Sequence, residues 1–149
     1  MATLQDFEEL AEQHLNTAII LMTAKDWCGA AYMMGYVLEF TLKGEACKSL
    51  NFEYYPETHN SDKVVSFFKT HYFDQLIMIS GVSNLFDTRG TPEAQQNWSD
   101  FTASYLGEWP TMRYNKDIRR QFDKTKVESL YYILTNDKDG IMKVIKDKK

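Results

Sequence analysis

Two charged side chains, Glu39 and Lys43, have the type and spacing to form a polar site. Residues four apart share one face of an α-helix, and a glutamate that precedes a lysine is the favourable order for an ion pair. On a solvated helix such a pair contributes only ~0.2–0.5 kcal/mol. The spacing alone favours this surface ion pair over the alternative, a polar seam at a groove or subunit boundary beside Tyr32 and Tyr36.

The second group of candidates is basic and lies in the C-terminal third of the chain. If one helix extends back to position 113, four cations fall within roughly 80° of its circumference: Arg113, Lys116, Arg120 and Lys124. Tyr114 and Trp109 stand beside them, and an aromatic face can stack on a base for ~1–3 kcal/mol. These side chains suit binding of a phosphate next to a base or sugar, although a charge run alone is more typical of a solvated helix face.

The charge is distributed unevenly along the chain. Residues 1–110 carry 6 Lys and Arg against 15 Asp and Glu, a formal charge of −9. Residues 111–149 carry 11 against 6, a formal charge of +5, so the net charge is −4. The acidic total therefore does not exclude an anionic partner for the C-terminal third.

Each of the three histidines has a structural interpretation. His14 lies in the apolar arc of the first predicted helix, so we expect a core or interface residue. His59 lies in a polar loop, which predicts a surface residue, with a role as ligand or base as the alternative. His71 and Asp74 could share a helix face, but a metal ion needs at least one further ligand, and none is near in sequence. We therefore predict no metal site.

The usual enzyme motifs are absent from the sequence. Every glycine that could belong to a phosphate-binding loop is isolated, so we expect no cofactor. Cys28 and Cys47 have no close partner for zinc. On one predicted helix they would lie ~28 Å apart, too far for a disulfide. Reduced thiols are typical of a cytoplasmic protein.

Length and composition favour one soluble domain over residues 1–149. With 149 residues and 44% hydrophobic side chains, the chain is long enough to bury a core. No apolar run approaches the ~18–20 residues that a membrane span needs. The acidic, amphipathic N-terminus does not resemble a secretory signal.

Periodic apolar residues predict a long N-terminal helical hairpin. The first helix carries one stripe, formed by Leu4, Phe7, Ala11, Leu15, Ala18 and Met22, and Thr3 can cap its start. The second helix runs from about Trp27 to Leu50 after a short break at residues 25–26. Small residues in its first half, including Gly35, allow a neighbouring backbone to approach closely.

Shorter helices are predicted after a connecting loop at 51–60. We expect helices at about 61–68, 73–82, 92–106 and 116–136, followed by a short basic tail at 138–149. The fold class is therefore all-α, an up-and-down bundle of four to five helices with no strand partner for the apolar run at 73–82.

The segment 30–43, Ala-Ala-Tyr-Met-Met-Gly-Tyr-Val-Leu-Glu-Phe-Thr-Leu-Lys, resembles the second-helix signature of the HEPN family, the higher-eukaryote and prokaryote nucleotide-binding domains. In that family a helical hairpin carries small residues and then a Leu-Glu-x-x-x-Lys-like element. The stretch from Tyr105 to Tyr114 looks like the segment that leads into the family's last long helix. The resemblance implies a helical bundle, commonly a homodimer, that binds RNA or nucleotides.

Many members of this family are metal-independent ribonucleases, often toxins or parts of defence systems. Their signature is an arginine followed, after four to six residues, by a histidine. Arg113 fits the first position, but Ile118, Arg119 and Arg120 fill the places of the histidine, and the last histidine in the chain is His71. Arginine stays protonated and cannot act as the base. Losing a general acid or base lowers the reaction rate by ~10²–10⁴-fold, so we assign no catalytic residue.

These inferences predict a catalytically degenerate, cytoplasmic, dimeric HEPN-like domain that binds RNA or nucleotide phosphate. The expected ligand-binding residues, which would border one cleft, are Arg113, Tyr114, Lys116, Arg120, Glu39 and Lys43. One alternative is a divergent ribonuclease that draws on Arg113, Tyr114, Lys116 and His59. The other is a protein-interaction module, such as an antitoxin or an immunity partner.

Overall fold

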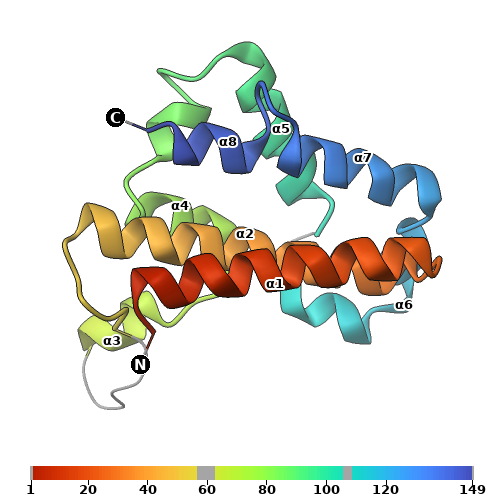
Figure 1. Cartoon of the computed structure of the whole chain (residues 1–149), viewed down its shortest axis with the longest axis horizontal. Coiled ribbons are helices and arrows are strands. Elements are labelled where there is room, and N and C mark those ends of the chain that lie inside the picture. The colour runs from red at the N-terminus through yellow and green to blue at the C-terminus, as the bar shows by residue number, and fades with distance from the viewer. Residues whose placement is uncertain (1, 57–62, 106–108, 149) are drawn as a thin grey trace.

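The computed structural model describes residues 2–56, 63–105 and 109–148, and within these ranges it contains helices and no strands (Figure 1). The α-helices are α1 (Leu4–Thr23), α2 (Trp27–Ser49), α3 (Lys63–Phe68), α4 (Phe73–Ile79), α5 (Pro92–Ala103), α6 (Lys116–Gln121), α7 (Lys124–Thr135) and α8 (Ile141–Lys146). Two 3₁₀-helices are η1 (Ser83–Phe86) and η2 (Trp109–Tyr114). The predicted all-α class is confirmed.

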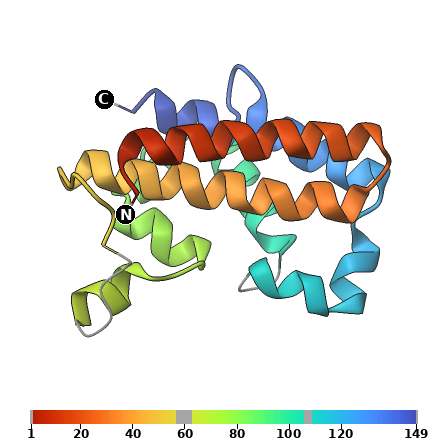
Figure 2. The ribbon, with the colours of Figure 1, turned by 60° about the horizontal axis from the view of Figure 1, so that its bottom comes forward.

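The predicted hairpin is formed by α1 and α2, which lie side by side in Figures 1 and 2. At the start of α1, the Asp6 backbone N–H donates to Thr3 Oγ1 (3.2 Å) and the Thr3 N–H donates to Asp6 Oδ2 (2.9 Å). Lys25 adopts a left-handed backbone conformation, with φ 63°, in the short turn that connects α1 to α2. Asp26 then caps α2 by accepting from the Gly29 N–H at 3.0 Å.

Helix α2 is the central element of the fold. It contacts α1, α4, α7, α8 and η2, and most of its residues from Ala30 to Cys47 are buried. In Figure 2, α3 and α4 lie below the hairpin toward one end, and η2 and α6 lie below it toward the other. Because neighbours surround α2 on several sides, its few charged side chains must find partners inside the protein.

Gly35 on α2 leaves room for the large side chain of Trp109 on η2. A Cβ atom built on Gly35 would lie 2.5 Å from the ring atom Cε3 of Trp109. The indole therefore packs directly against the α2 backbone, and Trp109 is 0% exposed. The close approach predicted for this half of α2 is made by this side chain.

The predicted start of a helix at Lys116 is confirmed, but the single helix over 116–136 is wrong, because a second cap at Asp123 divides the segment. Asn115 Oδ1 accepts from the N–H groups of Asp117 (3.0 Å) and Ile118 (3.1 Å), so α6 begins at Lys116 and does not continue from η2. Asp123 Oδ1 accepts from the Lys126 N–H (2.9 Å) and starts α7. Side-chain oxygens that satisfy these N–H groups compete with continued helix. No single helix face therefore carries the four predicted cations.

The basic segment 138–149 contains a packed helix where the sequence suggests a tail. In α8, Ile141 is 0% exposed and Ile145 is 2% exposed, and their four-residue spacing places both on the face that meets the core. Beyond this helix, Lys148 Nζ lies 3.4 Å from Glu45 Oε1 on α2. No helix in the described ranges combines the length and the hydropathy that crossing a membrane requires.

Candidate functional site

The carboxylate of Glu39 is the polar centre of the molecule. Its Oε1 accepts from the Trp109 indole Nε1–H at 3.2 Å and lies 2.6 Å from Nδ1 of His71. Its Oε2 lies 3.3 Å from Nζ of Lys43. We call these four residues the Glu39 site. They bring together α2, η2 and the segment before α4, although His71 and Trp109 are 32 and 70 residues from Glu39 in the chain.

The Glu39–Lys43 ion pair is buried in the protein and is not solvated. Glu39 is 2% exposed and Lys43 is 3% exposed, so the interpretation as a solvated surface pair is wrong. The Lys43 ammonium also lies 5.3 Å from the centroid of the Tyr55 ring, a cation–π contact. Removing one partner of a buried ion pair leaves an uncompensated charge, which costs ~3–5 kcal/mol. The pair is therefore a structural requirement of this part of the core.

His71 is the functional candidate that the sequence did not reveal. Because a carboxylate only accepts, the Nδ1 atom of His71 is the donor in its contact with Glu39. In the neutral imidazole this fixes the proton on Nδ1 and leaves the lone pair on Nε2. The His71 side chain is 45% exposed. A carboxylate that orients a partly exposed imidazole is an arrangement that serves proton transfer in enzymes.

A signal for this site does exist in the sequence. Glu39 is the first charged residue of α2 and follows a run of small, apolar and aromatic residues, and a carboxylate buried there must be hydrogen-bonded. Pairing His71 with Asp74 considered only neighbours in sequence, whereas the actual partner lies on another helix. Sequence spacing identifies partners within one helix, but it does not identify partners that tertiary packing brings together.

Trp109 does not present an aromatic surface to a ligand, as the sequence suggested. It is 0% exposed, and its ring meets Tyr36 edge-on at 4.4 Å between centroids and stacks on Phe73 at 6.2 Å. Its hydrogen bond to Glu39 ties the start of η2 to α2. Trp109 is thus a positioning residue for the segment that carries the predicted basic site.

The remaining predicted site residues lie around the junction of η2 and α6. Tyr114 is 83% exposed, and Lys116 and Arg120 are also exposed. The side chain of Arg113 and the whole of His59 fall outside the described part of the structure. Their predicted roles therefore stay predictions.

A cavity of about 370 Å³ lies between the start of α2, the end of η2 and α6. Its lining residues are Asp26, Cys28, Gly29, Tyr32, Met112, Tyr114 and Arg119. Tyr114 and Arg119 both line this cavity, although Arg119 was not among the predicted ligand-binding residues. Glu39 and Lys43 do not line it, so it is not the single cleft predicted for all six residues. We call Tyr114, Lys116, Arg119 and Arg120 the η2–α6 surface.

Other reactive side chains have structural partners. His14 is half-buried and its Nδ1 lies 2.8 Å from the Leu10 carbonyl oxygen, as predicted for a satisfied core histidine. Burial raises the pKa of the Tyr105 hydroxyl, which donates to the Ala31 carbonyl at 2.7 Å. Within the described residues, no group of His, Cys, Asp and Glu has the arrangement of a metal site.

Comparison of the chain with models of protein families, with curated proteins and with solved structures found no match. The HEPN-like character of residues 30–43 therefore stays an expectation from the sequence. Functional assignment rests on the two groups of residues described above, the Glu39 site and the η2–α6 surface.

Proposed function

We propose that this protein is a HEPN-like helical domain that binds RNA or a nucleotide through the η2–α6 surface, without cleaving it. One observation carries the proposal: Tyr114 and Arg119 line the same cavity, and exposed Lys116 and Arg120 stand on the same short helix as Arg119. An aromatic ring and a guanidinium at one cavity are the two groups that a base and its phosphate require.

The charge of this region supports an anionic ligand. Residues 109–126 contain six Lys and Arg against two Asp, whereas residues 1–108 are strongly acidic. A local positive surface on a negative protein raises the local concentration of phosphate-bearing ligands and directs their approach. Screening by salt weakens this attraction, so binding is expected to depend on ionic strength.

The cavity suggests how the ligand is oriented. The Asp26 carboxylate lies in the wall at the start of α2 and repels a phosphate there. The phosphate therefore sits with Arg119 and Lys116 on the outer side, and the base enters beside Tyr114. An imino or amino group of the base can donate to the carboxylate oxygen of Asp26 that does not cap α2.

The test is a fluorescence anisotropy titration with a labelled single-stranded RNA and with a labelled mononucleotide. We expect Tyr114→Ala and Arg119→Ala each to weaken binding about tenfold, equivalent to ~1.4 kcal/mol. Lys138→Ala is the matched control, since Lys138 is exposed in the turn before α8. Absence of salt-sensitive binding to either probe, or equal loss in the control variant, overturns the proposal.

A second candidate function, a divergent metal-independent ribonuclease, is favoured by the 2.6 Å contact between His71 Nδ1 and Glu39 Oε1. His71 Nε2 would take the proton from the attacking 2′-hydroxyl of RNA. Incubation with RNA in the presence of EDTA separates the two functions. Fragments that disappear with His71→Asn but persist with Lys138→Ala support cleavage, and intact RNA supports binding alone.

A further inference from the structure

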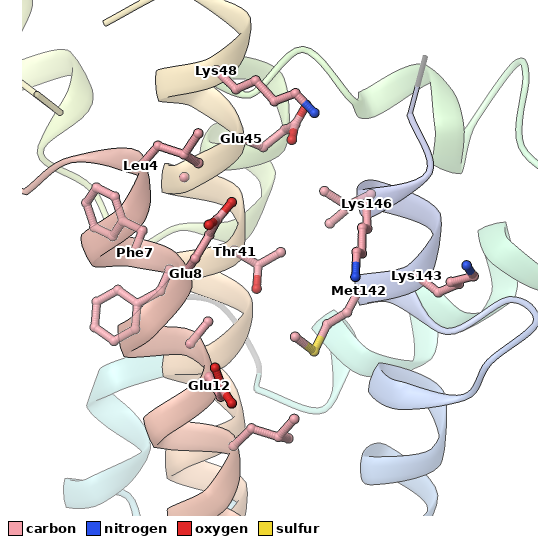
Figure 3. A pocket seen from close by; sticks show the side chains of 15 residues that line it. Leu4, Phe7, Glu8, Glu12, Thr41, Glu45, Lys48, Met142, Lys143 and Lys146 are labelled. Atoms are coloured by element: carbon pink, nitrogen blue, oxygen red, sulfur yellow. The ribbon is translucent and has the colours of Figure 1, made fainter. Parts of the chain in front are cut away.

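A second cavity, of about 500 Å³, lies between the helical hairpin and α8, and neither the Glu39 site nor the η2–α6 surface includes it (Figure 3). We call it the α1–α8 groove. Its apolar lining comes from α1, α2 and α8, namely Leu4, Phe7, Ala11, Leu15, Phe40, Met142 and Ile145. The volume is within the ~300–1,000 Å³ that is typical of small-molecule sites.

The groove is elongated along α1. Its lining residues on that helix run from Leu4 to Leu15, a distance of ~16 Å at a rise of ~1.5 Å per residue. Leu15, Phe40 and Met142 are half-buried, so their side chains present apolar surface to the groove. An elongated apolar space of this kind is suited to one extended hydrocarbon chain, because each methylene that leaves water contributes to binding.

The two walls of the groove carry opposite charges. Glu8 and Glu12 lie on the α1 wall, Lys146 lies on the α8 wall, and Lys48 lies on α2 at the same groove (Figure 3). In the described ranges none of these four side chains forms an ion pair. Lys143, on the same wall as Lys146, is paired with Asp147 at 3.1 Å. The groove therefore presents two uncompensated carboxylates and two uncompensated ammonium groups beside an apolar floor.

We infer that the α1–α8 groove binds a single-chain amphiphile with a zwitterionic head group. The hydrocarbon chain lies along Leu15, Phe40 and Met142. The cationic part of the head meets Glu8 and Glu12, and the anionic part meets Lys146. A purely anionic head would face the two glutamates and a purely cationic head would face Lys48 and Lys146, so a head with both charges fits best.

The test uses isothermal titration calorimetry with dodecylphosphocholine below the concentration at which it forms micelles. Dodecanoate and dodecyltrimethylammonium, which carry one charge each, are the comparison ligands. We expect saturable binding of dodecylphosphocholine, with affinity at least about tenfold higher than that of either comparison ligand. No saturable binding, or equal affinity for all three ligands, overturns the inference.

Charge reversal tests the assignment of the two walls. Glu12→Lys and Lys146→Glu are each expected to weaken binding about tenfold, and the double variant is expected to recover part of the loss, because it restores one charge of each sign across the groove. Glu128→Lys and Lys138→Glu are matched controls at exposed positions outside the groove. An unchanged affinity in both single reversals overturns the inference.

Two further measurements distinguish other occupants. Thr41→Phe, at a half-buried position that lines the groove, fills the space without changing charge and is expected to abolish binding, with circular dichroism showing that the fold persists. Sedimentation of the free protein tests whether a second copy covers the groove. A dimer that Lys146→Glu converts to monomer overturns the amphiphile assignment. Because the groove shares no residue with the η2–α6 surface, failure here leaves the RNA proposal untouched.

Discussion

The Nδ1 atom of His71 lies 2.6 Å from the Oε1 atom of Glu39, and this contact joins the segment before α4 to the middle of α2. The same oxygen accepts from Trp109, so one buried carboxylate holds two segments that follow it in the chain by 32 and 70 residues. Glu39 thereby determines both where the imidazole stands and where η2, the start of the proposed ligand surface, begins.

Replacing Glu39 by alanine should lower the free energy of unfolding by ~3–5 kcal/mol, because Lys43 is then a buried ammonium without its carboxylate. Urea denaturation followed by circular dichroism measures the change. Glu128→Ala, at an exposed position on α7, should change stability by less than ~0.5 kcal/mol. The double variant Glu39→Leu/Lys43→Met should recover much of the loss, and a double variant as unstable as Glu39→Ala would contradict the charge argument.

Gly35→Ala should destabilise the protein by ~1–3 kcal/mol, although alanine is the better helix former. The added Cβ would stand 2.5 Å from the Trp109 ring and force the indole away. Thermal or urea unfolding measures the effect. In a Trp109→Leu background the same substitution should cost much less, and an equal cost in both backgrounds would exclude this contact as the cause.

The cap of α1 should make stability depend on pH. Hydrogen bonds with the Thr3 backbone and side chain lower the pKa of Asp6 below the ordinary aspartate value of 3.8. A lowered pKa in the folded state means that the stabilisation is present above pH 3.8 and is lost as the pH falls through the folded-state value. The stability difference between wild type and Asp6→Asn should therefore shrink on acidification. A difference that is constant with pH would contradict the charged cap.

Helix α8 should behave as part of the core. Ile145→Ala should lower the free energy of unfolding by ~2–5 kcal/mol, because Ile145 is 2% exposed. Met78→Ala, at a side chain 73% exposed on α4, serves as the control and should have little effect. Equal stability of the Ile145 variant and wild type would mean that the last helix does not pack as described.

Much of the fold could be predicted from local patterns. The hairpin follows from apolar spacing, and both the Thr3 cap and the Thr91–Pro92 start of α5 are visible as residue types. The same patterns failed where a cap competes with helix. Asp123 was placed inside one helix over 116–136, whereas its side chain accepts from the Lys126 N–H and begins a new helix there.

The candidate site was less predictable, for a physical reason. Glu39 and Lys43 form a local pair that spacing indicates, but burial and the partners His71 and Trp109 depend on how distant helices pack. Arg119 was not among the predicted ligand-binding residues because, on one continuous helix from position 113, it lies outside the stripe of cations. In the structure Asn115 caps α6 as a helix separate from η2, and Arg119 and Tyr114 both line the cavity.

Binding at the η2–α6 surface is tested most directly by mapping amide chemical shifts of the labelled protein during titration with a mononucleotide. The account predicts saturable shifts at Cys28, Gly29, Tyr114 and Arg119, which line one cavity. It also predicts that these shifts weaken as salt is raised from about 50 to about 200 mM. Shifts confined to other parts of the chain, or no saturable shift at any concentration, would contradict it.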